Sequence, residues 1–68
     1  MNVKYFKDTD TALLEFSDAD VEETREISEN VYVDLDKAGN VVSMTIEHAT
    51  TVARFPQVHI EEIGVSAA

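Results

Sequence analysis

Residues 11–16 form a short, mostly apolar run with the pattern of a β-strand, in which one face is apolar and the other carries Leu13 and Glu15. Ala12, Leu14 and Phe16 fall on one side of the segment. A shorter run of β-forming residues precedes it at residues 3–6, and the small polar residues between the two runs favour a turn. We therefore predict two strands joined by a turn, and we expect the side that carries Phe16 to be buried.

The clearest strand signal comes from two β-branched runs, residues 31–35 and 41–46, which are separated by a polar loop that contains Gly39. This arrangement predicts a β-hairpin. We expect Gly39 to adopt a positive φ, where a residue with a Cβ atom is strained. Alternation along both runs and along the preceding strand then predicts a core of eight residues: Leu14, Phe16, Val31, Val33, Leu35, Val42, Met44 and Ile46.

Three other segments have weaker patterns. Residues 21–27 are too charged for a core element and favour an exposed edge strand or irregular chain. Residues 49–55 predict one or two helical turns, with Thr50 as the capping hydroxyl and with Pro56 disfavouring continuation of the helix. Residues 57–63 alternate at first and then shift to a helical spacing, and we favour a final strand over a helix there.

These elements predict a single domain over residues 1–63 and a frayed tail over residues 64–68. The expected fold class is α+β, mainly β, with a small antiparallel sheet of four to five strands and one short helix near the C-terminal third. A domain of 68 residues buries only about 60% of the surface that its unfolded chain exposes, and this sequence has no cysteine for disulfides or thiolate zinc sites. We therefore expect a partner subunit, most simply in a homodimer, to supply part of the stability, with strand exchange as one route.

The chain is strongly acidic: fourteen Asp and Glu residues against five Lys and Arg residues give a net charge of −9. This charge repels phosphate backbones and anionic lipid headgroups, so we expect no direct binding to nucleic acid or to membranes. It favours encounter with a small basic protein partner, while adaptation to a salty cytoplasm would produce the same composition. The first residues run straight into alternating sequence without an apolar leader, so we expect a cytoplasmic protein.

One segment begins like a calcium-binding loop, with Asp34 and Asp36 two residues apart. Such a loop needs an oxygen ligand at its fifth position and a glutamate at its twelfth, and these positions hold Ala38 and Thr45. We therefore interpret Asp36, like Asp10, as a turn former whose side chain bonds to backbone amides.

The sequence contains no recognisable catalytic machinery. It has no cysteine, no Gly-x-Ser-x-Gly motif and only two glycines, which excludes a phosphate-binding glycine loop, so we expect no cofactor. His48 and His59 each lie near carboxylates that would suit zinc or nickel, but nothing in the sequence brings the two histidines together, so we expect no metal. Glu15 and Asp34 lie within apolar strands but point away from the predicted core, which favours a solvated position over that of a general acid. The weak site candidates are Asp34, Glu47 and His48.

Four segments in order resemble a small prokaryotic family catalogued as domain of unknown function 2283. They are residues 3–5, residues 10–18, residues 31–36 leading to Gly39, and residues 42–46 leading to Ala49 and Thr50. The chain departs from the family pattern in two places. The second strand has Leu13, Leu14 and Glu15 where an aromatic, an aliphatic and a basic residue are common, and His48 stands where an acidic or amide residue is common.

The resemblance implies a compact antiparallel sheet with a short helix. The family has no established activity, so no catalytic residue can be transferred to this chain. The resemblance also implies an antitoxin-like role, because the chain looks like small proteins whose genes lie beside those of small toxin-like proteins.

The most consistent functional hypothesis is a non-enzymatic protein-interaction module, acting as a homodimer, as an acidic partner of a small basic protein, or as both. Alternation places Tyr5, Leu13 and Tyr32 opposite the predicted core, where aromatic residues favour interfaces. The alternative is a small ligand-binding or metal-binding protein or enzyme, with a site that includes Asp34, Glu47 and His48 and is completed across a dimer interface.

Overall fold

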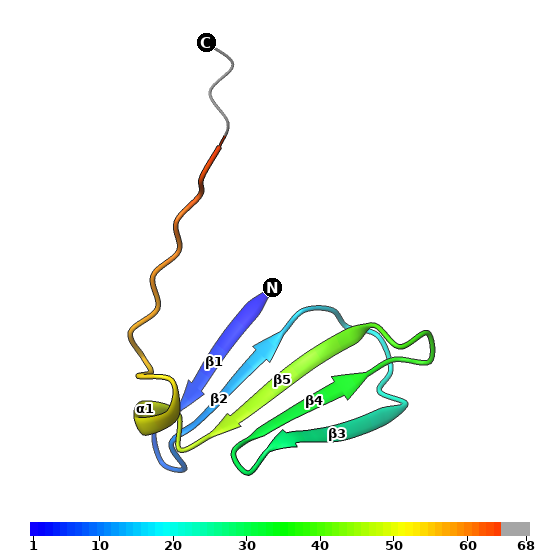
Figure 1. The fold of residues 1–68 in the computed structure, drawn as a ribbon, viewed down its shortest axis with the longest axis horizontal. Coiled ribbons are helices and arrows are strands. Elements are labelled where there is room, and N and C mark those ends of the chain that lie inside the picture. The colour runs from blue at the N-terminus through cyan, green and yellow to red at the C-terminus, as the bar shows by residue number, and fades with distance from the viewer. Residues whose placement is uncertain (65–68) are drawn as a thin grey trace.

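The protein folds as one antiparallel sheet with a short helix packed at one end of it (Figure 1). The computed structural model describes residues 1–64. In chain order the elements are β1 (Asn2–Phe6), β2 (Thr11–Glu15), β3 (Glu23–Ser28), β4 (Val31–Leu35), β5 (Val41–Glu47) and α1 (Ala49–Val52). The strands are arranged in the order β1-β2-β5-β4-β3, and each pairs antiparallel with its neighbours. The predicted mainly β fold with one short helix is confirmed.

The predicted hairpin is formed by β4 and β5. Its loop is held by Asp36, whose Oδ1 accepts hydrogen bonds from the amides of Ala38 at 3.0 Å and Asn40 at 2.8 Å. Gly39 has a φ of 87°, in the region that favours glycine. The predicted turn roles of Asp36 and Gly39 are therefore confirmed.

The chain from β2 to β3 crosses the β4–β5 hairpin, because these two strands lie between β2 and β3 in the sheet. Backbone hydrogen bonds of 2.8 Å anchor both ends of this connection, from the Phe16 amide to the Val42 carbonyl and from the Glu22 amide to the Leu35 carbonyl. All six residues of β3 are exposed, so the expectation of a charged, exposed edge strand is confirmed. Charged side chains on an edge strand disfavour pairing with other chains.

The hydrophobic core lies between the sheet and α1. Ala12 and Ile46 of the sheet contact Ala49 of the helix, and both alanines are fully buried. Their small side chains let the helix backbone approach the sheet closely. The partly buried residues that surround this cluster are Tyr5, Leu14, Val31, Met44 and Phe55.

The predicted core residues lie on the predicted face of the sheet, but fewer of them are buried than expected. Of its eight members, Val33, Val42 and Ile46 are buried, while Phe16 is 41% exposed. The other four are half-buried: Leu14, Val31, Leu35 and Met44. The expected burial of Phe16 is wrong because this residue lies beside Val42, at the opposite end of β5 from α1.

The helix is a single turn and begins at a left-handed residue, His48, with a φ of 54°. The prediction of Thr50 as its capping hydroxyl is wrong, because Thr50 Oγ1 donates a hydrogen bond to Asp10 instead. The predicted strand at residues 57–63 is also wrong: this segment leaves the body of the molecule without pairing with an edge of the sheet (Figure 1). Of the expected tail, residues 65–68 lie outside the described residues.

Candidate functional site

Strand register arranges the side chains on the helix side of the sheet in rows that run across the strands. The row beside α1 contains Tyr5, Ala12, Ile46 and Val31. The next row contains Val3, Leu14, Met44 and Val33. Phe16 follows Leu14 on the same side of its strand. We call Val3, Leu14, Phe16, Val33 and Met44 the open face, since this surface lies beyond α1. Its exposed members are Val3 at 43% and Phe16 at 41%, while Leu14 and Met44 are half-buried and Val33 is buried.

The open face is apolar and carries no net charge. The charged strand residues on this side are Glu23 and Arg25, where Arg25 lies opposite Val33. Arg25 Nε is 2.7 Å from Glu23 Oε2, and this hydrogen bond lowers the pKa of Glu23. The remaining charged strand residues alternate onto the other side of the sheet: Lys4, Glu15, Glu26, Asp34 and Glu47. Most of the charge on the strands is therefore directed away from the open face.

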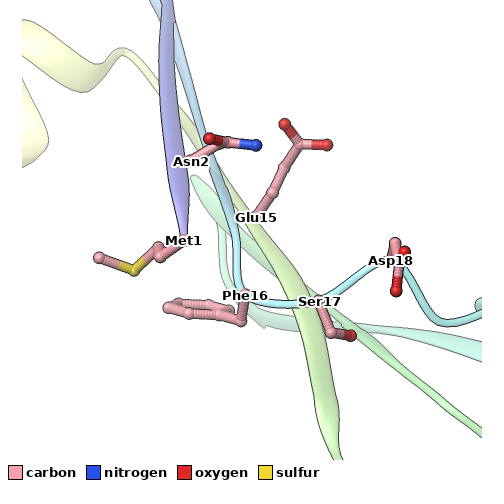
Figure 2. Close-up of a pocket in the computed structure, with 6 residues that line it drawn as sticks. All are labelled: Met1, Asn2, Glu15, Phe16, Ser17 and Asp18. Atoms are coloured by element: carbon pink, nitrogen blue, oxygen red, sulfur yellow. The ribbon is translucent and has the colours of Figure 1, made fainter.

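A cleft of 330 Å³ lies at the end of the sheet far from α1. Figure 2 shows Met1 and Phe16 pointing to one side of the strands, with Asn2 and Glu15 pointing to the other. The Oε1 atom of Glu15 is 2.9 Å from Nζ of Lys4, on the outer side of the sheet. The two apolar side chains, Met1 and Phe16, thus extend the open face to the rim of the molecule.

Asp10 joins the helix to the sheet. Its carboxylate accepts hydrogen bonds from the Tyr5 hydroxyl at 2.7 Å, the Thr50 hydroxyl at 2.8 Å and the Thr50 amide at 3.1 Å. These bonds lower the pKa of Asp10, with the Tyr5 bond the largest cause, and the same bond raises the pKa of Tyr5. The Tyr5 ring in turn stacks on Phe55, with the ring centroids 6.1 Å apart. Asp10 thus fixes α1 and the chain that follows it.

Asp34 lies at the centre of a hydrogen-bonded row on the outer face, the side of the sheet opposite α1. Its carboxylate accepts bonds from the Ser43 hydroxyl at 2.6 Å and from the Thr24 hydroxyl, both on neighbouring strands. These bonds, that of Ser43 first, lower the pKa of Asp34. A carboxyl held in its ionised form cannot serve as a general acid, so Asp34 links strands β3, β4 and β5 instead.

Tyr32 lies among carboxylates on the outer face. Glu26 is its cross-strand partner on β3, and Glu47 lies on β5. The negative charge of Glu47 is the largest cause of a raised pKa at Tyr32, and Glu26 and Glu29 act in the same direction. The aromatic ring therefore lies in a strongly negative environment.

The three residues predicted to form one interface do not share a face. Leu13 and Tyr32 both lie on the outer face, in a row where Thr45 separates them. Tyr5 pairs with Ala12 and packs against the core under α1, so its predicted position opposite the core is wrong. The physical reason is the register of β1 on β2, which a single short strand does not reveal by itself.

The weak site candidates are not gathered into one site within a single chain. Asp34 lies opposite Ser43, four residues from Glu47 along β5, which corresponds to about 14 Å. His48 Nδ1 is 2.9 Å from Asn30 Oδ1. Within residues 1–64, no cluster of three or more His, Asp or Glu side chains has the geometry to hold a metal ion.

Sequence reasoning missed the partners of Asp10 and the packing role of Phe55. The bond between Asp10 and Thr50 joins residues 40 positions apart, and no local pattern encodes such a contact. The stacking of Phe55 on Tyr5 likewise depends on the path of the chain after α1. In the described part of the chain, no helix has the length and apolar character needed to cross a membrane.

Comparison with known proteins identifies the family but no relative of known activity. No curated protein and no solved structure gives a significant match. Residues 2–49, which include the five strands and the start of α1, match the family described as protein of unknown function (DUF2283). Because the match covers well over half of the chain, this protein belongs to the DUF2283 family.

Proposed function

We propose that this protein is an interaction module that acts as a homodimer, with the open faces of the two copies turned toward each other and buried in the dimer. The open face is the observation that supports the proposal. It is an apolar surface that crosses four strands, and beyond the cluster under the four-residue helix it leaves Val3 and Phe16 exposed. Sheet faces of this kind are normally buried by a second layer of structure, and a second copy supplies that layer.

The charge distribution favours self-association through this face. Two chains that each carry a charge of −9 repel one another at long range. Contact between open faces directs the charged rows of the outer faces into solvent on both sides of the dimer. The paired Glu23 and Arg25 at the margin neutralise each other. The open face is therefore the surface of the sheet on which two acidic copies meet with least repulsion.

Two matched substitutions on β2 and the residue after it test which face is used. Phe16→Glu places a charge on the open face, and Leu13→Glu places the same charge on the outer face. We expect Phe16→Glu to give a monomer and Leu13→Glu to leave the dimer intact, as measured by light scattering coupled to size-exclusion chromatography. Circular dichroism checks that both variants fold. A wild-type chain that is monomeric at all concentrations up to about 1 mM would contradict the proposal.

The surroundings of Tyr32 support a second candidate function, the binding of a small basic protein on the outer face. An aromatic ring among Glu26, Glu29 and Glu47 offers both stacking and ion pairing to an arginine side chain. In this arrangement the dimer would present one acidic surface on each side. Antitoxin-like proteins that neutralise basic partners need such a surface.

A defined arginine-rich peptide provides a test of the outer face. Titration should shift the backbone NMR signals around Tyr32 and leave those around Phe16 unchanged, and Tyr32→Ala should weaken binding more than Tyr5→Phe does. Tyr5→Phe is the matched control because Tyr5 lies on the other side of the sheet. Shifts spread evenly over the acidic surface, or unaltered binding by Tyr32→Ala, would argue against this second function.

A further inference from the structure

The segment that follows the helix is an apolar arm that extends away from the sheet. Residues 57–64 form neither helix nor strand, and Figure 1 shows them running outward from the body of the molecule. Val58 is 54% exposed, Ile60 81% and Ile63 85%. Aliphatic side chains exposed to this extent along one segment are costly in water, so they indicate a surface that is buried elsewhere.

The root of the arm is firmly held, which sets its direction. The Phe55 amide donates to the Ala49 carbonyl at 3.1 Å, and the Gln57 amide donates to the Arg54 carbonyl at 3.0 Å. The Phe55 ring stacks on Tyr5. With these contacts formed, the arm runs outward from the body of the molecule next to α1 (Figure 1). To lie on its own sheet, the arm would have to turn back from this path.

We infer that residues 57–63 of one copy lie across the open face of a second copy, and that the exchange is reciprocal. This inference rests on the homodimer proposed above and names the segment that completes it. An extended segment of seven residues reaches about 23 Å, and a five-stranded sheet is about 19 Å wide, so one arm spans the whole face.

The size of the sheet also favours a contribution from the arm. Five strands of about five residues present a flat face of only about 300 Å². A stable interface buries about 800 Å² on each partner. Two faces of this size offer each other little surface, and an arm that lies between the sheets and covers its neighbour's face enlarges the buried interface.

The side-chain pattern of the arm fits a surface that is apolar and uncharged. In an extended conformation Val58, Ile60 and Glu62 point to one side, while His59, Glu61 and Ile63 point to the other. Val58 and Ile60 meet the open face, and Glu62, the last residue on that side, reaches the margin of the sheet. The acidic residues of the arm thereby avoid the carboxylates of the outer face.

Single cysteines can report this contact directly, because the chain has none of its own. Full-length Ile60→Cys is mixed with full-length Phe16→Cys and treated with a short bismaleimide cross-linker. The matched control replaces Phe16→Cys with Leu13→Cys, which lies on the outer face. We expect the Ile60–Phe16 mixture to give at least tenfold more cross-linked heterodimer than the control, as measured by mass spectrometry.

The outcomes separate this inference from the homodimer proposal. A chain that dimerises but gives equal cross-linking in the test and the control overturns the exchange of arms and leaves the homodimer standing. A monomeric chain overturns both. Cross-linking within one chain of the Ile60→Cys/Phe16→Cys double variant, without cross-linking between chains, shows the arm folded on its own sheet and also overturns the exchange. Val3→Cys, on the same face, provides a second reporter if Phe16→Cys fails to fold.

Discussion

Shortening one side chain of the arm should weaken the dimer without affecting the fold. Ile60→Ala removes three carbon atoms, each worth about 0.8 kcal/mol when buried. Because Ile60 is 81% exposed in its own chain, nearly all of its burial must come from the partner, which gives about 2 kcal/mol for each arm. A symmetric dimer loses this contribution twice. The expected total is about 4 kcal/mol, or about a thousandfold increase in the dimer Kd.

Sedimentation equilibrium over a dilution series measures this change. The control is His59→Ala, one position earlier on the solvent side of the extended arm, and its Kd should stay within about threefold of the wild-type value. Thermal unfolding at a concentration where both proteins are monomeric should give the same melting temperature for Ile60→Ala and wild type. A Kd that rises less than about tenfold, or by equal amounts in both variants, would refute the reasoning.

Three further predictions concern the stability of the fold. Ile46→Ala should lower the free energy of unfolding by about 3 kcal/mol, since Ile46 is 8% exposed and packs under α1. This loss is comparable to the whole stability of so small a domain, so the variant should have lost its folded far-ultraviolet circular dichroism spectrum at 37 °C, and a spectrum like that of the wild type would contradict the prediction. Gly39→Ala should lower the free energy of unfolding, measured in urea, by about 1 kcal/mol. The φ of 87° strains any residue with a Cβ atom, and the open space around Gly39 means that no steric clash adds to this effect. An unchanged urea midpoint would refute the role of the turn. Asp10→Asn should lower the melting temperature most above about pH 5. A carboxyl with a depressed folded-state pKa stabilises the fold above its unfolded pKa, and this stabilisation is lost as the pH falls through the folded pKa, so the gap between variant and wild type should narrow as the pH falls below the ordinary aspartate pKa of about 3.9. A gap independent of pH would contradict the hydrogen-bonded carboxylate.

Local signals in the sequence were sufficient for most of the strands. The hairpin of β4 and β5 follows from two β-branched runs around a glycine-containing loop, and Asp36 bonds the loop amides as its residue type predicts. These features depend on residues within a few positions of one another. A short stretch of sequence around each feature is therefore enough to predict it.

The candidate surface was only partly predictable. Alternation identified Leu14 and Met44 as neighbours on one face, and they are cross-strand partners. It could not place Tyr5, because the register of β1 depends on which residues of β2 it meets. It could not show that Phe16 is exposed either, since that depends on how far α1 extends over the sheet.

The amino-acid sequence alone determined the class of fold, the hairpin, the acidic character and the membership of a family, because these depend on composition and on short-range periodicity. Only the tertiary structure decided which apolar residues stay uncovered. It brought Asp10 to Thr50 across 40 positions, which sets the helix on one end of the sheet. It also directed the arm of Ile60 outward, because the turn at Phe55 is held by contacts with Ala49 and Tyr5. Burial is a property of the whole folded chain, and so the open face emerges only when every strand is in register.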